Sequence, residues 1–128
     1  MPATIPDEFL DAMAEKLRLF ADPTRLSILR ALSMRERSVS EVVEATGRGQ
    51  ANVSKHLKLL TNAGLVARRK EGLRVYYKLD DPLVGKLCDL LCATLVSEAR
   101  AELSRTRRLL DTWSKTSRRD KSGRVKTR

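Results

Sequence analysis

The chain has 128 residues, 41% of them apolar, so it is long enough for one domain with an ordinary core. Its amino-terminal segment has neither a cationic start nor an apolar run. The most apolar window, residues 82–96, is too short to span a bilayer and is interrupted by Lys86 and Asp89. We therefore expect no secretory signal and no membrane partner, and we expect the two cysteines to be reduced thiols in the cytoplasm.

The formal net charge of +10 is concentrated in two segments. Residues 48–78 have a net charge of +7 and residues 114–128 of +6, whereas residues 1–47 and 79–113 have −2 and −1. Localised charge of this kind indicates a polyanionic partner. The last segment also lacks apolar periodicity, so we predict a folded domain over residues 1–113 and a disordered basic tail over 114–128. Two roles for this tail stay open, namely sequence-independent phosphate contacts or a terminus that only improves solubility.

The first half of the chain is expected to begin with two helices. The spacing of its apolar residues predicts a first helix over about residues 6–21. Asp22 and Pro23 are typical of an N-cap followed by the first helical position, and they predict a second helix that ends near Ser33. The residues that this second helix is expected to bury are Leu26, Leu29 and Leu32.

Two further helices, separated by a Gly-Arg-Gly turn, have the arrangement of a helix-turn-helix. The first of this pair is predicted to be capped by Ser40 and to end near Thr46, because Gly47 suits the left-handed residue that stops a helix. The second is predicted to follow Gly49 and to cover Gln50–Asn62. In DNA-binding proteins of this kind, the second helix enters the major groove.

The helix over Gln50–Asn62 is expected to have one apolar and one polar side. With residues placed roughly 100° apart, Val53, Leu57 and Leu60 lie within about 60° of one another and face the core. The residues expected on the polar side and its flanks are Gln50, Ala51, Asn52, Ser54, Lys55 and Lys58. Amide side chains fit adenine and lysine fits guanine, so base readout is expected chiefly from Gln50, Asn52, Ser54 and Lys55. The alternative is a polar helix face that only contacts solvent.

Residues 65–79 predict two strands around a Glu-Gly turn. In the second strand Val75, Tyr77 and Leu79 alternate with polar residues, which is typical of a half-buried strand. The cationic residues of this hairpin that we single out as DNA contacts are Arg68, Arg69, Lys70 and Arg74. We expect them to contact phosphates or a minor groove and to fix register; for each one, an exposed charge without a DNA contact is the alternative. A reader helix followed by a cationic hairpin indicates binding to double-stranded DNA.

One long helix is predicted from Asp81-Pro82 to about Trp113, and its length indicates contact with a second copy of the chain. Cys88 and Cys92 lie four residues apart on its apolar stripe. They are interpreted in two ways: as small packing residues between two copies, or as an inducer site. In the second case, thiolates of two copies would bind a soft divalent metal ion or form a disulfide between subunits. We favour thiol-based sensing over a diffusible organic inducer.

No residue pattern of an enzyme is found. A Gly-rich phosphate loop, a catalytic triad and a paired set of carboxylates are all missing, and Cys-x-x-x-Cys inside a helix fits a thiol oxidoreductase poorly. His56, the only histidine, is predicted to be a packing residue at the edge of the buried face or a phosphate donor. A role as a metal ligand is disfavoured because no cysteine or carboxylate lies near it in a suitable pattern. We predict no catalytic residues and a protein that is not an enzyme.

Four short motifs occur in a specific order. They are Asp22-Pro-Thr-Arg25, Gln50-Ala-Asn-Val-Ser-Lys-His-Leu57, Ala63-Gly-Leu-Val66 and Glu71-Gly-x-Arg-Val-Tyr-Tyr77. Together they resemble the ArsR/SmtB family of bacterial winged-helix repressors, over roughly residues 9–99. The resemblance implies a mainly α fold with a small β-hairpin and a homodimer joined through its first and last helices. It also implies a repressor that binds a palindromic operator and is released by an inducer.

The chain departs from the family pattern at several positions. Arsenic- and cadmium-sensing members carry Cys-Val-Cys where this chain has Ser38-Val39-Ser40, and zinc-sensing members use histidines on a last helix that has none here. Gly49 stands where the family prefers a serine cap, and Leu73 where an arginine is common in the wing. The operator sequence therefore does not carry over from a relative. The alternative function is a ligand-independent or architectural DNA-binding protein whose cysteines only pack.

Overall fold

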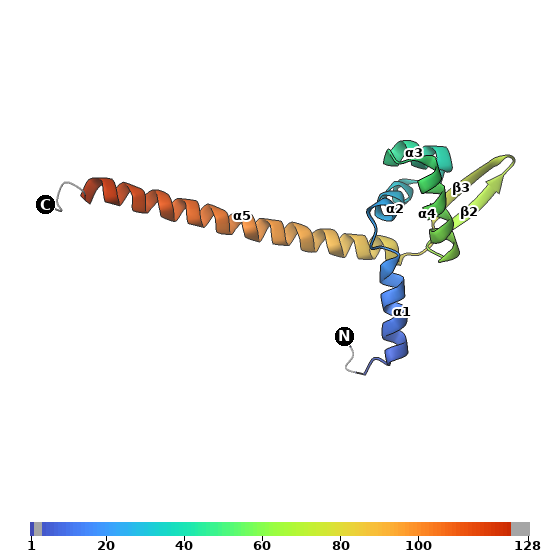
Figure 1. Cartoon of the computed structure of the whole chain (residues 1–128), viewed down its shortest axis with the longest axis horizontal. Helices are drawn as coiled ribbons and strands as arrows, with labels where there is room; N and C mark the ends of the chain where they lie inside the picture. Colours follow the sequence, from blue (N-terminus) through green and yellow to red (C-terminus); the bar gives the residue numbers. More distant parts are fainter. Residues whose placement is uncertain (2–3, 124–128) are drawn as a thin grey trace. The chain divides into compact units, whose positions relative to one another are not determined.

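In a computed structural model, residue 1 and residues 4–123 are described. They belong to two compact units, residues 1–86 and the residues from 87 onward. The described part of the first unit contains helices α1 to α4, a three-stranded sheet and the start of helix α5 (Figure 1). The described part of the second unit is the remainder of α5. The predicted fold class, mainly α with a small antiparallel sheet in a winged helix-turn-helix, is confirmed.

The first four helices lie close to their predicted bounds, except that α1 ends at Arg18 and not near Ala21. They are α1 (Asp7–Arg18), α2 (Pro23–Met34), α3 (Val39–Thr46) and α4 (Gln50–Asn62). Asp22 caps α2 as predicted, because its Oδ1 accepts the backbone N–H of Arg25 at 3.0 Å. Gly47 ends α3 with a φ of +67°, which a residue with a side chain rarely adopts. The predicted bounds of α4 are confirmed.

The prediction that Ser40 caps α3 is wrong, because the cap is Ser38. The Oγ of Ser38 accepts the N–H of Glu41 at 3.3 Å, and the N–H of Ser38 donates to Glu41 Oε1 at 3.2 Å. This reciprocal pair is a capping box, and it starts α3 two residues earlier than a Ser40 cap would. The backbone hydrogen bond from Ser38, followed by the side-chain hydrogen bond from Arg35, lowers the pKa of Glu41 below its ordinary value of 4.5.

The three strands form one antiparallel sheet in the order β1-β3-β2, made of β1 (Arg37–Ser38), β2 (Val66–Glu71) and β3 (Arg74–Leu79). The predicted hairpin is confirmed, with a register that runs from Val66↔Leu79 to Glu71↔Arg74. Gly72 opens its two-residue loop with a φ of +62°. Strand β1 was not predicted, because two residues are too few to show an alternating pattern. The end of the hairpin projects past the helices of the first unit (Figure 1).

The core of the first unit lies where α2, α3 and α4 meet, with contacts from α2 to β3 and from α4 to β2. Its largest fully buried side chains are Ile28, Leu29, Val42, Val53, Leu57, Leu60, Leu65, Val66 and Val84. Leu26, which we expected in this core, is 39% exposed. Each residue of an α-helix is turned by about 100° from the one before it. Leu26 therefore points roughly 150° away from the buried side of α2.

Helix α5 (Leu83–Gly123) has 41 residues and is about 62 Å long. Asp81 Oδ1 accepts the N–H of Leu83 at 2.9 Å near its start. The helix was predicted to end near Trp113, but it continues to Gly123. The predicted disordered tail is therefore helical up to that residue, and residues 124–128 lie outside the described residues. The regular spacing of apolar residues stops after Trp113 because this part of the helix does not pack on a core. Its backbone can still be helical, since the segment is rich in Lys and Arg and contains no proline. No helix among residues 4–123 is long and apolar enough to cross a membrane.

The capping box of α3 gives a direct test with a matched pair of serines. Ser38→Ala is expected to lower the free energy of unfolding by about 1 kcal/mol, because it removes the acceptor for the Glu41 N–H. Ser40→Ala is expected to change it by only a few tenths. Urea unfolding followed by circular dichroism measures both. Equal effects would contradict the assignment of the cap.

The same cap has a pH dependence. The pKa of Glu41 is lower in the folded chain than in the unfolded chain. The contribution of ionised Glu41 to the free energy of unfolding is therefore complete above about pH 4.5, and it is lost as the pH falls through the pKa of Glu41 in the folded chain.

Candidate nucleic-acid interface

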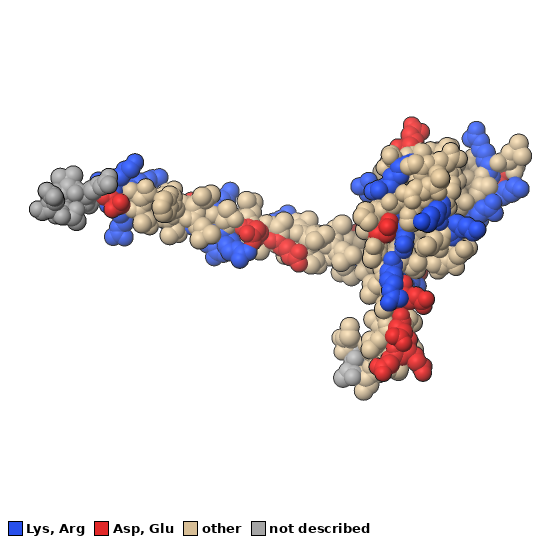
Figure 2. All heavy atoms as spheres, in the orientation of Figure 1, with Lys and Arg blue, Asp and Glu red and all other residues tan. Residues whose placement is uncertain are grey.

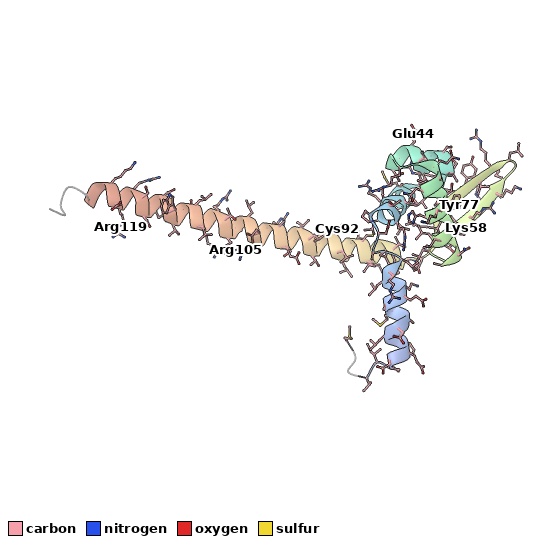
Figure 3. All side chains as sticks on the ribbon, in the orientation of Figure 1. Glu44, Lys58, Tyr77, Cys92, Arg105 and Arg119 are labelled. Carbon is pink, nitrogen blue, oxygen red and sulfur yellow. The ribbon has the colours of Figure 1, made fainter. Side chains whose placement is uncertain are left out.

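Helix α4 has the two sides that its sequence predicts. Val53, Leu57 and Leu60 have no exposed surface, and His56 is also buried. The residues predicted to face DNA are all exposed, namely Gln50, Ala51, Asn52, Ser54, Lys55 and Lys58. The side chain of Lys58 is labelled in Figure 3. The core therefore fixes the rotation of α4 about its own axis and leaves a polar side directed to solvent.

The turn before α4 is attached to α2 and leaves the first turn of α4 open. Arg48 Nη1 donates to Thr24 Oγ1 at 3.0 Å, and Arg48 Nε is buried without a hydrogen-bond partner. Gly49 is the N-cap of α4 and offers no side-chain acceptor. The N–H groups of the first turn, at the positive end of the helix dipole, are therefore not taken by a side chain of the cap. Such helix ends favour anions, including phosphate oxygens.

His56 and Arg25 connect α4 to two other helices. Arg25 Nε donates to His56 Nδ1 at 3.3 Å, and Arg25 Nη1 donates to the carbonyl of Arg18, the last residue of α1, at 2.9 Å. Nδ1 is therefore the acceptor nitrogen of the ring. Of the two predicted roles for His56, the packing residue agrees with its burial, whereas a contact with phosphate does not. Arg25 was not singled out in the sequence as a side chain that joins α1, α2 and α4.

The cations of the hairpin fall into two groups. The exposed cations that form no ion pair within the described part of the chain are Arg68, Lys70, Arg74 and Lys78. Arg69 differs, because its guanidinium forms ion pairs with Glu36 and Glu71. Lys and Arg side chains lie along the hairpin, whereas α1 carries many acidic ones (Figure 2). The free positive charge of the hairpin is thus provided by three of its four predicted contact residues and by Lys78, which was not predicted as a contact.

Comparisons with known proteins agree with this geometry. A family model described as "Bacterial regulatory protein, arsR family" matches residues 22–68. The "Probable mercury resistance operon repressor" of Streptomyces lividans is 37% identical over 101 residues, which are 79% of this chain and 80% of that protein. The solution structure of a homodimeric winged helix-turn-helix DNA-binding domain from Mycobacterium bovis is 31% identical and has a TM-score of 0.64. The match covers 77% of this chain and 94% of the Mycobacterium bovis chain.

The chain belongs to the ArsR family. A further relative is the transcriptional repressor SmtB of Mycobacterium tuberculosis, which is 44% identical over 80 residues, 62% of this chain. The match spans 59% of SmtB, and a match to the regulator KmtR of the same organism spans 66% of that protein. Both figures are below two thirds of those relatives' length. The relatives are named as transcriptional regulators or repressors, so the prediction that the chain is not an enzyme is confirmed.

At the position where some ArsR-family members are expected to carry thiolates, this chain has two serines with structural roles. Ser38 caps α3, and the Oγ atoms of Ser38 and Ser40 lie 3.2 Å apart. Neither hydroxyl has the charge or softness that favours a soft metal ion.

The two cysteines on α5 are free thiols. Cys88 is half-buried and Cys92, labelled in Figure 3, is exposed. Burial, followed by the charges of Cys92 and Asp89, raises the pKa of the Cys88 thiol. Among the described residues no group of three or more Cys, His, Asp or Glu is placed to hold a metal ion. One chain therefore supplies at most two thiolates, half of a tetrahedral site.

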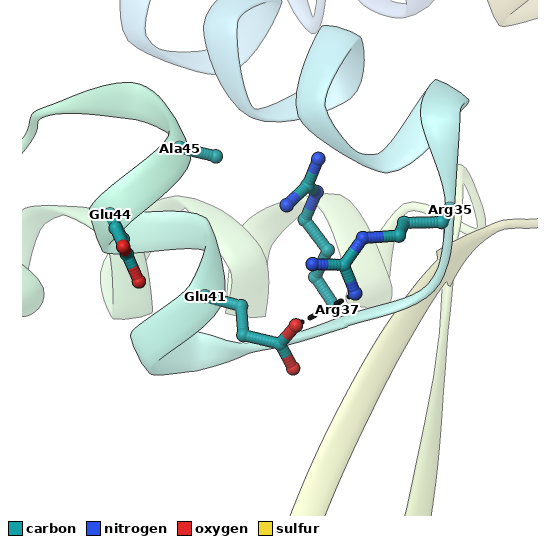
Figure 4. Close-up of a pocket in the computed structure, with 5 residues that line it drawn as sticks. All are labelled: Arg35, Arg37, Glu41, Glu44 and Ala45. Carbon is teal, nitrogen blue, oxygen red and sulfur yellow. Dashed lines mark hydrogen bonds and ion pairs between the residues drawn. The ribbon is translucent and has the colours of Figure 1, made fainter.

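A hollow of about 380 Å³ lies between the end of α2 and α3, lined by Arg35, Arg37, Glu41, Glu44 and Ala45 (Figure 4). Arg35 forms an ion pair with Glu41 at 2.8 Å, and Arg37 Nε donates to the carbonyl of Ala31 at 2.9 Å. Small-molecule sites are mostly apolar with a few converging polar groups. This lining has one small apolar side chain and arginines that are already bonded, so it does not resemble an inducer pocket.

The hydrogen bonds of Arg25 lead to a stability prediction. Arg25→Lys keeps the positive charge, but one ammonium group cannot serve both His56 Nδ1 and the Arg18 carbonyl. The free energy of unfolding is expected to fall by about 1–3 kcal/mol. Arg30→Lys, in the same helix and exposed, is the control and should change it by less than about 0.5 kcal/mol. Equal urea midpoints for the two variants would show that Arg25 does not join these helices.

Proposed function

We propose that the protein is a homodimeric transcriptional repressor that binds a palindromic operator in double-stranded DNA. The observation that carries this proposal is the division of α4, with a fully buried apolar side and an exposed side of amides, a hydroxyl and lysines. A helix held in this way can place several donors against base edges in the major groove. Membership of a family of bacterial regulatory proteins supports the same function.

Base readout is assigned to the first half of the exposed side of α4. Gln50 and Asn52 can form paired hydrogen bonds with adenine, Lys55 can donate to guanine, and Ser54 can take either role. Ala51 is small enough to let the backbone approach a base or a thymine methyl group. Lys58, further along the helix, fits a phosphate. All six side chains are exposed and none forms an ion pair with another described residue.

Phosphate contacts are assigned to the wing, defined as the hairpin of β2 and β3. Its free cations among the predicted contact residues are Arg68, Lys70 and Arg74. Each phosphate contact releases a condensed counterion, so these residues are expected to make affinity depend on salt without choosing the sequence. Arg69 was predicted to join them, and its two ion pairs support a different proposal for this residue.

The second copy is proposed to cover apolar surfaces that a single chain leaves exposed. Helix α1 has no buried residue, and Phe9 and Leu17 on it are 64% and 54% exposed. On α5, Leu91 and Leu95 are 50% and 63% exposed, on the stripe that carries Cys88 and Cys92. Apolar surface of this extent is typical of a protein interface. A two-fold dimer would present its reader helices about 34 Å apart, one turn of DNA.

Release by a thiol-directed inducer is proposed for Cys88 and Cys92. If the stripe of α5 forms the dimer contact, two chains bring four thiols together, enough for a soft divalent ion such as Zn or Cd. The raised pKa of Cys88 means that a metal ion must displace its proton. SmtB, CadC and the mercury operon repressor are named relatives, and the last two names refer to cadmium and mercury resistance. The competing proposal is a DNA-binding protein without an inducer, whose cysteines only pack.

Sequence-specific reading predicts the effect of two substitutions on the reader side. Asn52→Ala combined with Lys55→Ala is expected to reduce the preference for a selected duplex over random duplex at least about tenfold, since each paired base contact contributes about 1–3 kcal/mol. Competition band-shifts measure this preference on a duplex that the chain selects from a random library.

The control combines Asn62→Ala with Lys86→Ala, which removes the same residue types from exposed positions outside the proposed site. An unchanged preference in the Asn52/Lys55 variant, with its dimer intact, would leave an architectural protein as the better explanation.

The thiol proposal is tested by replacing both cysteines with serine. The Cys88→Ser/Cys92→Ser variant is expected to bind the operator as the wild type does, but to stay bound when Zn, Cd, arsenite, peroxide or polysulfide releases the wild type. Band-shift titration with each agent in turn measures release. If the variant is released by the same agents at the same concentrations, the cysteines are not the sensor.

A further inference from the structure

Arg69 lies at the centre of a polar cluster in the outer half of the wing. Its Nη2 and Nε are 2.5 and 3.1 Å from Glu36 Oε1, and its Nη1 is 2.7 Å from Glu71 Oε2. The guanidinium carbon lies 4.8 Å from the centre of the Tyr76 ring, which is the cross-strand neighbour of Arg69. We call Glu36, Arg69, Glu71 and Tyr76 the wing brace. All three nitrogens of the guanidinium are engaged within it.

The brace connects parts of the chain that are far apart in sequence. Glu36 lies in the link between α2 and β1, 33 residues before Arg69. Glu71 and Tyr76 belong to the wing itself. The contact between Arg69 and Glu36 therefore joins the wing to the segment that follows α2, a helix that packs on the reader helix α4. A change at Glu36 can thus alter the wing without touching any proposed DNA contact.

The outer part of the wing has little other support, whereas its inner part packs on α2, α3 and α4. Strand β1 pairs with β3 only at Arg37↔Tyr77 and Ser38↔Tyr76, and the residues from Lys70 to Arg74 are all exposed. Two-stranded hairpins are marginally stable in water without further packing. The side-chain hydrogen bond from Arg69 contributes most to lowering the pKa of Glu36. Since the pKa of Arg69 is in turn raised by Glu36 and Glu71, the pair stays charged at neutral pH.

We propose that Arg69 is a positioning residue, which holds the wing so that Arg68, Lys70 and Arg74 meet the DNA backbone, and that it does not itself bind phosphate. This inference rests on the proposed DNA binding. It assigns different roles to two adjacent arginines: Arg68 directs its charge outward, whereas Arg69 directs its charge into the brace. Glu36, an acidic residue, then promotes binding to a polyanion.

The two roles for Arg69 predict opposite signs for one substitution. If Arg69 is a positioning residue, Glu36→Gln loosens the wing and weakens operator binding, although it makes the chain more positive. The expected loss is roughly two- to fivefold, the scale of an exposed ion pair. If Arg69 is a phosphate ligand that Glu36 restrains, the same change frees it and tightens binding. Glu44→Gln, which removes an exposed carboxylate with no ion pair among the described residues, is the control for charge alone.

Salt dependence provides a second readout. Arg68→Ala is expected to reduce the slope of log affinity against log salt by about 0.9, because one phosphate contact is lost. Arg69→Gln, which removes the charge as Arg68→Ala does, should weaken binding and leave this slope unchanged. Tighter binding by Glu36→Gln, or a slope that falls in Arg69→Gln as it does in Arg68→Ala, would overturn the proposal.

A measurement without DNA separates the brace from the proposed function. In the free protein, Glu36→Gln should speed hydrogen exchange of backbone amides between Lys70 and Val75, while amides of α4 and all amides in Glu44→Gln keep their rates. Unchanged wing exchange in Glu36→Gln would refute the brace even if DNA binding is intact. Faster wing exchange in a chain that binds no duplex would support the brace and refute the proposed function.

Discussion

The packing of one side of α4 determines what the other side can do. Val53, Leu57 and Leu60 have no exposed surface, and burial of each such side chain contributes about 1.5–3 kcal/mol. A rotation of α4 by one residue, about 100°, would expose leucine and drive lysine toward the core. The identities of the residues that face outward are therefore fixed by the apolar residues between them. Specific recognition of bases requires this kind of rigidity, because paired hydrogen bonds tolerate little rotation of the helix.

Polar contacts hold α4 at the turn before it and at the middle of its buried side. Arg48 attaches the preceding turn to Thr24, and Arg25 donates to His56 from α2. Since Arg25 also donates to the carbonyl of Arg18, the end of α1 and the buried side of α4 share one guanidinium. A displacement of α1 would strain or break hydrogen bonds to a group that also contacts the reader helix. This connection offers a physical route from the proposed dimer contact to the DNA-binding surface.

The elements that could be predicted from the sequence are those with local signals. Asp22-Pro23 and Gly47 end or begin helices through contacts a few residues away, and α4 has enough turns for its apolar period to be clear. The failures have the opposite origin. Strand β1 exists only because it pairs with β3, nearly forty residues later. The end of α5 was misplaced because apolar periodicity measures burial, which a solvated basic helix does not need.

The charge of the candidate interface shows why its residues could be predicted only in part. In the sequence, residues 48–78 count as eight cations and one anion, and each cation is an equal candidate for DNA. In the folded chain Glu36, from outside that window, neutralises Arg69 together with Glu71. Formal charge thus overstates the potential around Arg69, in the outer half of the wing. Affinity for DNA depends on the cations that are free to pair with phosphates. Strand register and ion pairing decide which cations are free, and neither can be read from the composition.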